Sequence, residues 1–121
     1  MNRVKYEEFI AQYNLKRFVD AHRQDYATAL EEIRGGRKQS HWMWYIFPQL
    51  KGLGYSPTAN YYGIVDRDEA MMFLQHPQLG RHLYEITKEL LAIGDKLIEE
   101  ILGDIDALKF RSSMTLFNAV Y

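Results

Sequence analysis

The stretch "LKRFVDAHRQDYATALEEIRGG", residues 15–36, carries the pattern that decides the fold. A mainly apolar series recurs every three or four positions and charged residues fall between its members, as in an amphipathic helix. The series is Leu15, Phe18, Val19, His22, Tyr26, Ala29, Leu30 and Ile33. Gly35 and Gly36 end the pattern, because glycine adopts the left-handed conformation that closes a helix without steric cost. A long helix is therefore predicted over residues 15–34.

A second long helix is predicted over residues 77–93. Pro77 suits a first helical position, and we expect His76 to cap the helix that begins there. The apolar seam consists of Leu79, Leu83, Ile86, Leu90 and Ile93.

Shorter helices are predicted around these two, each from a residue that can cap a helix N-terminus. The candidate caps are Ser56, Asp66, Asp95 and either Ser112 or Ser113. The segment between residues 40 and 65 is ambiguous, and a strand pair there is the alternative to helix. The predicted fold is all-α: a compact, single-domain orthogonal bundle of about five to seven helices covering residues 1–121.

Composition narrows the classes of protein. The chain has 121 residues, 47% of them hydrophobic, which fits one domain with one core. Fifteen Lys and Arg against sixteen Asp and Glu give a net charge of −1, so nucleic acid is not an expected partner. The absence of cysteine excludes disulfides and thiolate metal sites. No apolar run reaches the roughly 20 residues of a membrane span, and no signal peptide pattern opens the chain, so we expect a cytoplasmic protein without membrane contact.

The segment "SHWMWYIFPQLKGLG", residues 40–54, raises the question of function. Aromatic residues of this density ordinarily fill a core. Polar residues bracket the two tryptophans, however, and burying such groups unpaired costs about 1–3 kcal/mol each. These residues are Lys38, Ser40, His41 and Gln49, around Trp42 and Trp44. They bond to one another, meet solvent, or face a ligand. His41 is the candidate acid or base, because imidazole titrates near neutrality, and a structural histidine is the alternative.

The segment "KFRSSMT", residues 109–115, is the second candidate region. If a helix begins at Ser112 or Ser113, its free N–H groups and Lys109 build an anion site. An ordinary serine cap is the alternative. The four histidines lack the spacing of a metal site, and no cofactor fingerprint occurs, so neither a metal nor a cofactor is predicted.

Several stretches resemble the domain-of-unknown-function 1810 family. They are "RFVDA" at Arg17, "EIRGGRKQSHWMW" at Glu32, "IFPQ" at Ile46, "GLGYS" at Gly52, "HPQLG" at His76 and "SSMTLF" at Ser112. The resemblance implies a small, all-helical, mostly bacterial cytoplasmic protein with no assigned activity. It also implies a further C-terminal helical segment that this chain lacks, and self-association if a flank of the core is left uncovered. It marks Ser56 as a member of the family motifs.

We expect a module that binds a small anionic nucleotide-like or sugar-phosphate ligand, with processing of that ligand as a further option. The cleft is predicted between the Lys38–Gln49 segment and the Lys109–Ser113 helix start. His41 is the catalytic candidate, and the ligand-binding candidates are Lys38, Ser40, Trp42, Trp44, Gln49, Ser56, Lys109, Ser112 and Ser113. The alternative is a protein-interaction module without catalysis, which would use an exposed aromatic patch over residues 42–45 and 55–62.

Overall fold

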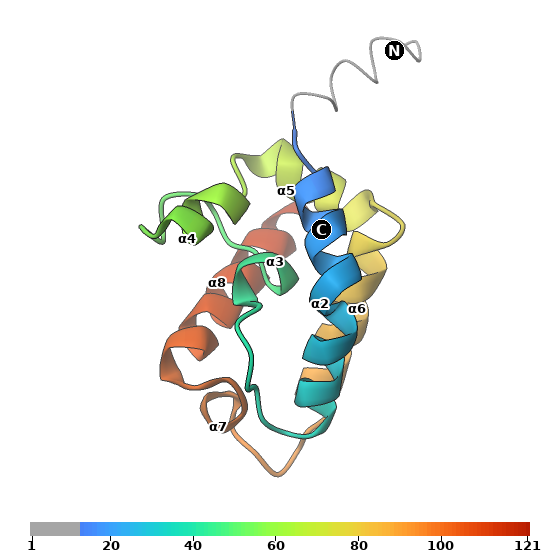
Figure 1. The fold of residues 1–121 in the computed structure, drawn as a ribbon, viewed down its shortest axis with the longest axis vertical. Coiled ribbons are helices and arrows are strands. Elements are labelled where there is room, and N and C mark those ends of the chain that lie inside the picture. The colour runs from blue at the N-terminus through green and yellow to red at the C-terminus, as the bar shows by residue number, and fades with distance from the viewer. Residues whose placement is uncertain (1–12) are drawn as a thin grey trace.

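A computed structural model describes residues 13–121 of the chain, and the regular elements there are all helices (Figure 1). They are α2 (Lys16–Arg34), α3 (Met43–Ile46), α4 (Pro57–Tyr62), α5 (Arg67–Gln75), α6 (Leu79–Leu91), α7 (Ile98–Leu102) and α8 (Asp104–Val120). The described part contains one isolated parallel bridge, between Leu50 and Ile64, in place of the alternative strand pair. The all-α prediction is confirmed. The first twelve residues of the predicted 1–121 domain lie outside the described residues.

Both long helices lie where the apolar periodicity predicts them. Helices α2 and α6 pack side by side, and the short helix α3 lies between α2 and α8 (Figure 1). The start of α6 is fixed by His76, whose Nδ1 accepts hydrogen bonds from the N–H groups of Gln78 and Leu79 at 3.1 and 3.2 Å. The predicted capping role of His76 is therefore confirmed.

Of the other four predicted caps, two are correct and two are wrong. Ser56 and Asp66 each accept a hydrogen bond from the backbone N–H three residues further on, and so begin α4 and α5. Asp95 caps nothing, because the chain stays non-helical until Leu97. The carboxylate of Glu100 accepts the hydrogen bond from the Leu97 N–H at 3.1 Å and closes this helix start.

The C-terminal helix is capped at Gly103, nine or ten residues before the predicted serine cap. Gly103, with a φ of 87°, ends α7, and α8 starts at Asp104. A carboxylate in the first turn complements the positive end of the helix dipole, so Asp104 suits that position. Ser112 and Ser113 consequently lie in the helix interior, where backbone N–H groups are already bonded. The prediction of a helix start at these serines is wrong.

The helices enclose a single aromatic-rich core. Phe18 meets Phe73 edge to face with ring centroids 5.1 Å apart, which joins α2 to α5. Phe47 meets Phe110 in the same way at 5.0 Å, which joins the end of α3 to α8. Such tilted pairs are favoured over face-to-face stacks. None of the helices in the described part has the length and apolarity that crossing a bilayer requires.

Candidate ligand-binding site

The Glu32 carboxylate binds several polar groups around Trp42. The indole Nε1 of Trp42, which is 1% exposed, donates to the Glu32 carboxylate at 3.0 Å. The same carboxylate accepts the Ser40 hydroxyl and N–H at 2.5 and 2.9 Å, and the Gln39 N–H at 2.7 Å. Burial raises the pKa of Glu32, but these hydrogen bonds outweigh it and lower the pKa to about 2. Ser40 and Trp42 therefore hold the loop after α2 through their hydrogen bonds to Glu32.

Trp44, two residues further on, lines an open pocket. The pocket has a volume of about 430 Å³ and lies between α3, the start of α4, and α8. Its walls are Trp44, Gln49, Leu53, Gly54, Tyr55, Ser56, Ala59, Ile105, Leu108, Lys109 and Ser112. Five of the nine predicted ligand-binding residues are in that set. The two regions predicted to meet, although far apart in sequence, do line one hollow.

One face of α8 forms a wall of this pocket. Ile105, Leu108, Lys109 and Ser112 recur at the three- and four-residue spacing that places side chains on one side of a helix. The sequence analysis missed Ile105 and Leu108 because it began the helix at the serines. A helical pattern extended back to Asp104 would have found them.

Two polar side chains of the pocket are unused. Within residues 13–121, neither the Gln49 side-chain amide nor the Ser112 hydroxyl makes a hydrogen bond, although both residues are partly buried. The Ser56 hydroxyl accepts from the Ala59 N–H at 3.1 Å, and its own proton is still available as a donor. The pocket thus offers hydrogen-bonding groups that the fold does not use.

The two predicted lysines share one carboxylate. Asp106 lies 3.0 Å from Lys38 Nζ through one oxygen and 3.9 Å from Lys109 Nζ through the other. Lys109 Nζ is 5.6 Å from the centroid of the Trp44 ring and lines the pocket. The Lys38 side chain is only 8% exposed and does not line the pocket. Its Nζ lies 5.1 Å from the centroid of the Trp42 ring. Asp106 was not predicted from the sequence, although its position three residues before Lys109 is a usable signal.

Besides Lys38, Ser40 and Trp42, two more predicted residues do not line the pocket. His41 is exposed, with its ring centroid 6.5 Å from that of Trp44, and stands beside the pocket. Ser113 is fully buried, and its hydroxyl is without a hydrogen-bond partner in the described part of the chain. Ser113 therefore faces the interior of the bundle and not the pocket.

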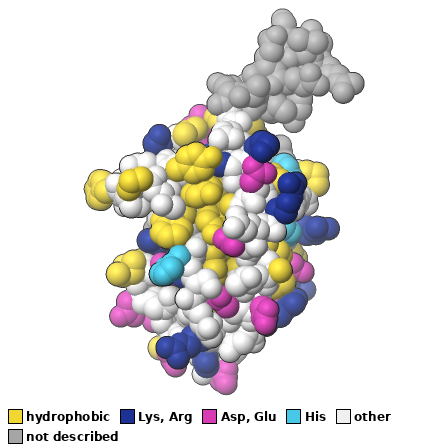
Figure 2. Space-filling model, viewed as in Figure 1, with side chains coloured by type: hydrophobic (Ala, Val, Ile, Leu, Met, Phe, Trp, Pro, Cys, Tyr) yellow, Lys and Arg dark blue, Asp and Glu magenta, His cyan; other side chains and the backbone are white. Residues whose placement is uncertain are grey.

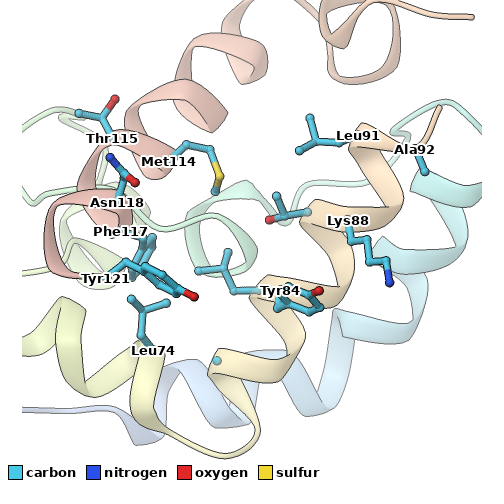
Figure 3. A pocket seen from close by; sticks show the side chains of 13 residues that line it. Leu74, Tyr84, Lys88, Leu91, Ala92, Met114, Thr115, Phe117, Asn118 and Tyr121 are labelled. Carbon is cyan, nitrogen blue, oxygen red and sulfur yellow. The ribbon is translucent and has the colours of Figure 1, made fainter. Parts of the chain in front are cut away.

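A larger apolar groove lies elsewhere, between α5, α6 and α8 (Figure 3). Its volume is about 1030 Å³, and Met114 of α8 and Leu91 of α6 point into it from opposite sides. Lys88 is at its rim. None of the predicted site residues lines this groove, so the sequence analysis missed it.

Two histidines form a buried pair away from both hollows. The Nδ1 atoms of His22 and His82 are 2.9 Å apart, and His22 Nε2 is 2.7 Å from the Tyr45 carbonyl oxygen. A carbonyl can only accept, so Nε2 of His22 carries the proton and His82 donates to His22 Nδ1. Burial lowers the pKa of His22 to about 4. In the described region no group of three or more potential ligands is placed to hold a metal ion.

The fold and the pocket define the class of protein: over the described residues it is a small all-helical domain with a pocket of mixed polar and apolar lining beside Trp44. The model of a family described as "Protein of unknown function (DUF1810)" matches residues 12–121, and the chain belongs to that family. The conserved hypothetical protein Rv1873 from Mycobacterium tuberculosis has a similar crystal structure, with a TM-score of 0.89 and 49% identity. That match covers 91% of this chain and 79% of the other. No curated protein matches.

Proposed function

We propose that this protein binds a small ligand with a flat ring and an anionic group in the pocket beside Trp44. The observation that carries the proposal is the contrast between the two tryptophans. Glu32 satisfies the polar groups around Trp42, whereas Gln49 and Ser112 near Trp44 are without hydrogen bonds in the described chain. Both residues are only partly buried, so water can occupy these groups and a ligand can take its place without breaking a hydrogen bond of the fold.

The ring of the ligand is inferred from the apolar walls. Trp44 provides an indole surface, and Ile105 and Leu108 on α8 are largely exposed, so a ligand ring would cover them. Tyr55 is 90% exposed at the rim and offers a second aromatic surface. Flat rings stack on such side chains with a gain of about 1–3 kcal/mol per ring.

The anionic group is inferred from Lys109. Its ammonium group lies over the Trp44 ring, so a ligand stacked near the indole would bring an anion within reach of it. The Ser112 hydroxyl is one turn further along the same face of α8 and would donate to the same anion. The backbone N–H groups of α8 make no contribution here, because the helix begins well before these residues.

Whether the ligand is also processed depends on His41. This histidine is exposed beside the pocket, where it would reach only a ligand that extends past Trp44. Binding is therefore the core of the proposal, and general acid or base catalysis by His41 is its extension.

A thermal-shift screen tests the proposal. The probes are nucleosides, nucleotides and aromatic carboxylates, applied to the wild type and to the variants Lys109→Met and Gln49→Leu. A probe at 100 times its dissociation constant should add about 2.7 kcal/mol to stability, roughly 10 °C in melting temperature. Lys88→Met is the matched control, because it removes a lysine from the apolar groove.

We expect both pocket variants to lose the rise while Lys88→Met keeps it. An equal rise in all four proteins, or no rise with any probe, would overturn the proposal. His41→Ala should bind such probes as the wild type does, and a hydrolysis or transfer product formed only by proteins that contain His41 would establish catalysis.

The alternative is a protein-interaction module, which the exposed side chains of Tyr55 and Tyr61 favour. The fold buries Trp42 and Tyr45, so the predicted aromatic patch is reduced to Tyr55 and Tyr61, which are 90% and 56% exposed. Figure 2 shows hydrophobic side chains gathered over the region of α3 and α4, among charged groups of both signs. Light scattering at rising protein concentration, with Tyr55→Ser beside the wild type, tests it. A wild-type dimer that the substitution dissociates would support it, and a monomer throughout would count against self-association.

A further inference from the structure

We infer that the pocket selects ligands that carry a single negative charge on a flat ring, as a carboxylate or a phosphodiester does, and that Asp106 sets this selectivity. The inference rests on the proposed function, because it concerns the same pocket. To the proposed function it adds the charge of the ligand and the role of Asp106, a positioning residue that does not itself line the pocket.

The first step is the charge of the pocket wall. Of the described residues that line the pocket, Lys109 is the only charged one. Its other polar groups are neutral: the Gln49 amide and the hydroxyls of Ser56, Ser112 and Tyr55. A single fixed positive charge faces the ligand.

The second step is the charge just behind the wall. Lys38 and Lys109 approach the two oxygens of the same carboxylate, so three ionised groups leave a net charge of +1. The Lys38 side chain is 8% exposed and held at 3.0 Å by Asp106, which keeps it from reaching the pocket as a second cation. Arg111 on the same helix pairs with Glu99 at 2.5 Å and adds no free charge.

The third step compares ligands of different charge. A monoanion matches the one free cation, and neutral hydroxyl and amide donors complete its hydrogen bonds. A phosphomonoester carries about −1.5 to −2 at pH 7, so part of its charge would be left unbalanced near the Asp106 carboxylate. A neutral ligand gains nothing from Lys109.

Asp106 acts through Lys109 in this scheme. Its carboxylate attracts the Lys109 ammonium from one side, while the Trp44 ring lies 5.6 Å from that ammonium on the other. Replacing the carboxylate by an amide of the same shape raises the local charge from +1 to +2 and leaves the pocket wall unchanged.

The experiment uses two ring-matched series with charges of 0, −1 and −2. One series is adenosine, cyclic AMP and AMP; the other is 2-naphthamide, 2-naphthoate and 2-naphthyl phosphate. Titration calorimetry at pH 7.5 with the wild type should show the monoanion binding tightest in at least one series. The series in which this holds distinguishes a phosphodiester from a carboxylate ligand.

The decisive variant is Asp106→Asn. We expect it to improve binding of the dianion relative to the monoanion by roughly fivefold, because one repelling charge is removed. Asp104→Asn is the matched control: it makes the same change in net charge on the same helix, at an exposed residue outside the pocket wall. It should leave the ratio within about twofold, because solvent screens exposed charges.

The outcomes separate the two proposals. If no probe binds the wild type, the proposed function fails and this inference fails with it. If the dianion binds tightest in both series, the proposed function stands and the inference is overturned. An unchanged ratio in a folded Asp106→Asn removes the role of Asp106. If that variant does not fold, Lys109→Met decides: loss of the preference for the monoanion supports the inference, and an intact preference overturns it.

Discussion

At the scale of single residues, Trp42 and Trp44 show how one motif contains two environments. An α-helix has 3.6 residues per turn, so side chains two positions apart around α3 point to nearly opposite sides. Trp42 consequently turns toward Glu32 of α2, and Trp44 toward Lys109 of α8. The interpretation that the aromatic block is core holds for the first indole, whereas the second is partly buried against the core and also lines the pocket.

Replacing Glu32 tests the Trp42 side. We expect Glu32→Gln to lower the free energy of unfolding by about 1–2 kcal/mol, because the new amide nitrogen would face hydrogen-bond donors. Urea titration followed by tryptophan fluorescence measures the change. Glu31→Gln is the matched control, an exposed neighbour whose replacement should have an effect within about 0.5 kcal/mol. Equal effects of the two substitutions would remove the assigned role of Glu32.

The lowered pKa of Glu32 gives this contribution a pH dependence. The folded-state pKa of about 2 lies below the ordinary value of 4.5. The stabilisation is therefore complete above pH 4.5 and is lost as the pH falls toward 2. Unfolding free energies measured in urea between pH 5.5 and 2.5 should decline less steeply for Glu32→Gln than for the wild type; parallel declines would contradict the assignment.

At the scale of elements, the contact between α5 and α6 depends on a glycine. A Cβ on Gly80 would lie 2.0 Å from the Leu74 carbonyl oxygen, far inside van der Waals contact. The short connection through His76 brings the start of α6 against the last turn of α5, and only a residue without a side chain fits there. The motif "HPQLG" thus contains both His76, which caps α6, and Gly80, which allows α5 and α6 to approach closely.

Substituting this glycine is expected to be costly. Gly80→Ala must push the two helices apart, and we expect a loss of about 3 kcal/mol in unfolding free energy. Gly94→Ala is the control, since an added Cβ there meets nothing within 4 Å. Its effect should be within about 0.5 kcal/mol. Thermal melts followed by circular dichroism measure both, and a Gly80→Ala protein as stable as the control would disprove the close packing.

At the scale of the whole molecule, a buried ion pair and the histidine pair tie distant parts of the chain together. The buried Arg17 guanidinium contacts the Glu69 carboxylate at 3.0 Å and joins α2 to α5. His22 and His82 join α2 to α6, and the Tyr45 carbonyl adds α3 to this link. Positive and negative side chains are interspersed on the face seen in Figure 2, as a net charge of −1 suggests.

The histidine pair predicts a fall in stability in mild acid. The folded-state pKa of His22 is about 4, below the ordinary value of 6.5. Between pH 4 and 6.5 the unfolded chain therefore binds more protons than the folded protein does. Stability is therefore complete above pH 6.5 and is lost as the pH falls toward 4. His76 and Arg81 also face the pair electrostatically and oppose its protonation, whereas Glu85 favours it on His82.

Melting temperatures between pH 7.5 and 4.5 test this prediction. His22→Gln keeps an N–H donor for the Tyr45 carbonyl but cannot titrate, so its melting temperature should fall less over that range. His41→Gln is the control, because it removes an exposed histidine. Identical pH profiles for all three proteins would show that the pair does not contribute to the acid sensitivity.

The sequence predicted several residues of the candidate site correctly, but not the way in which the fold places them. Lys109 and Ser112 do line the pocket, but as members of one helical face and not as a helix start. Ser40 was correctly picked out as a polar residue in need of a partner, yet its partner is Glu32, which lies eight residues earlier on α2. Asp106 and the groove between α6 and α8 escaped prediction, because each depends on which helices become neighbours.

The amino-acid sequence by itself determined the two long helices and the starts of α4 and α5, since apolar periodicity, capping side chains and glycine stops act over a few neighbouring residues. It also marked Trp44, Gln49 and Lys109 as candidate site residues. Only the tertiary structure decided which polar groups are satisfied: Glu32 reaches Ser40 and Trp42, while Gln49 and Ser112 are left facing a pocket. The physical reason is that hydrogen bonds and ion pairs act over about 3–4 Å, a proximity that the packing of distant helices sets and local sequence does not.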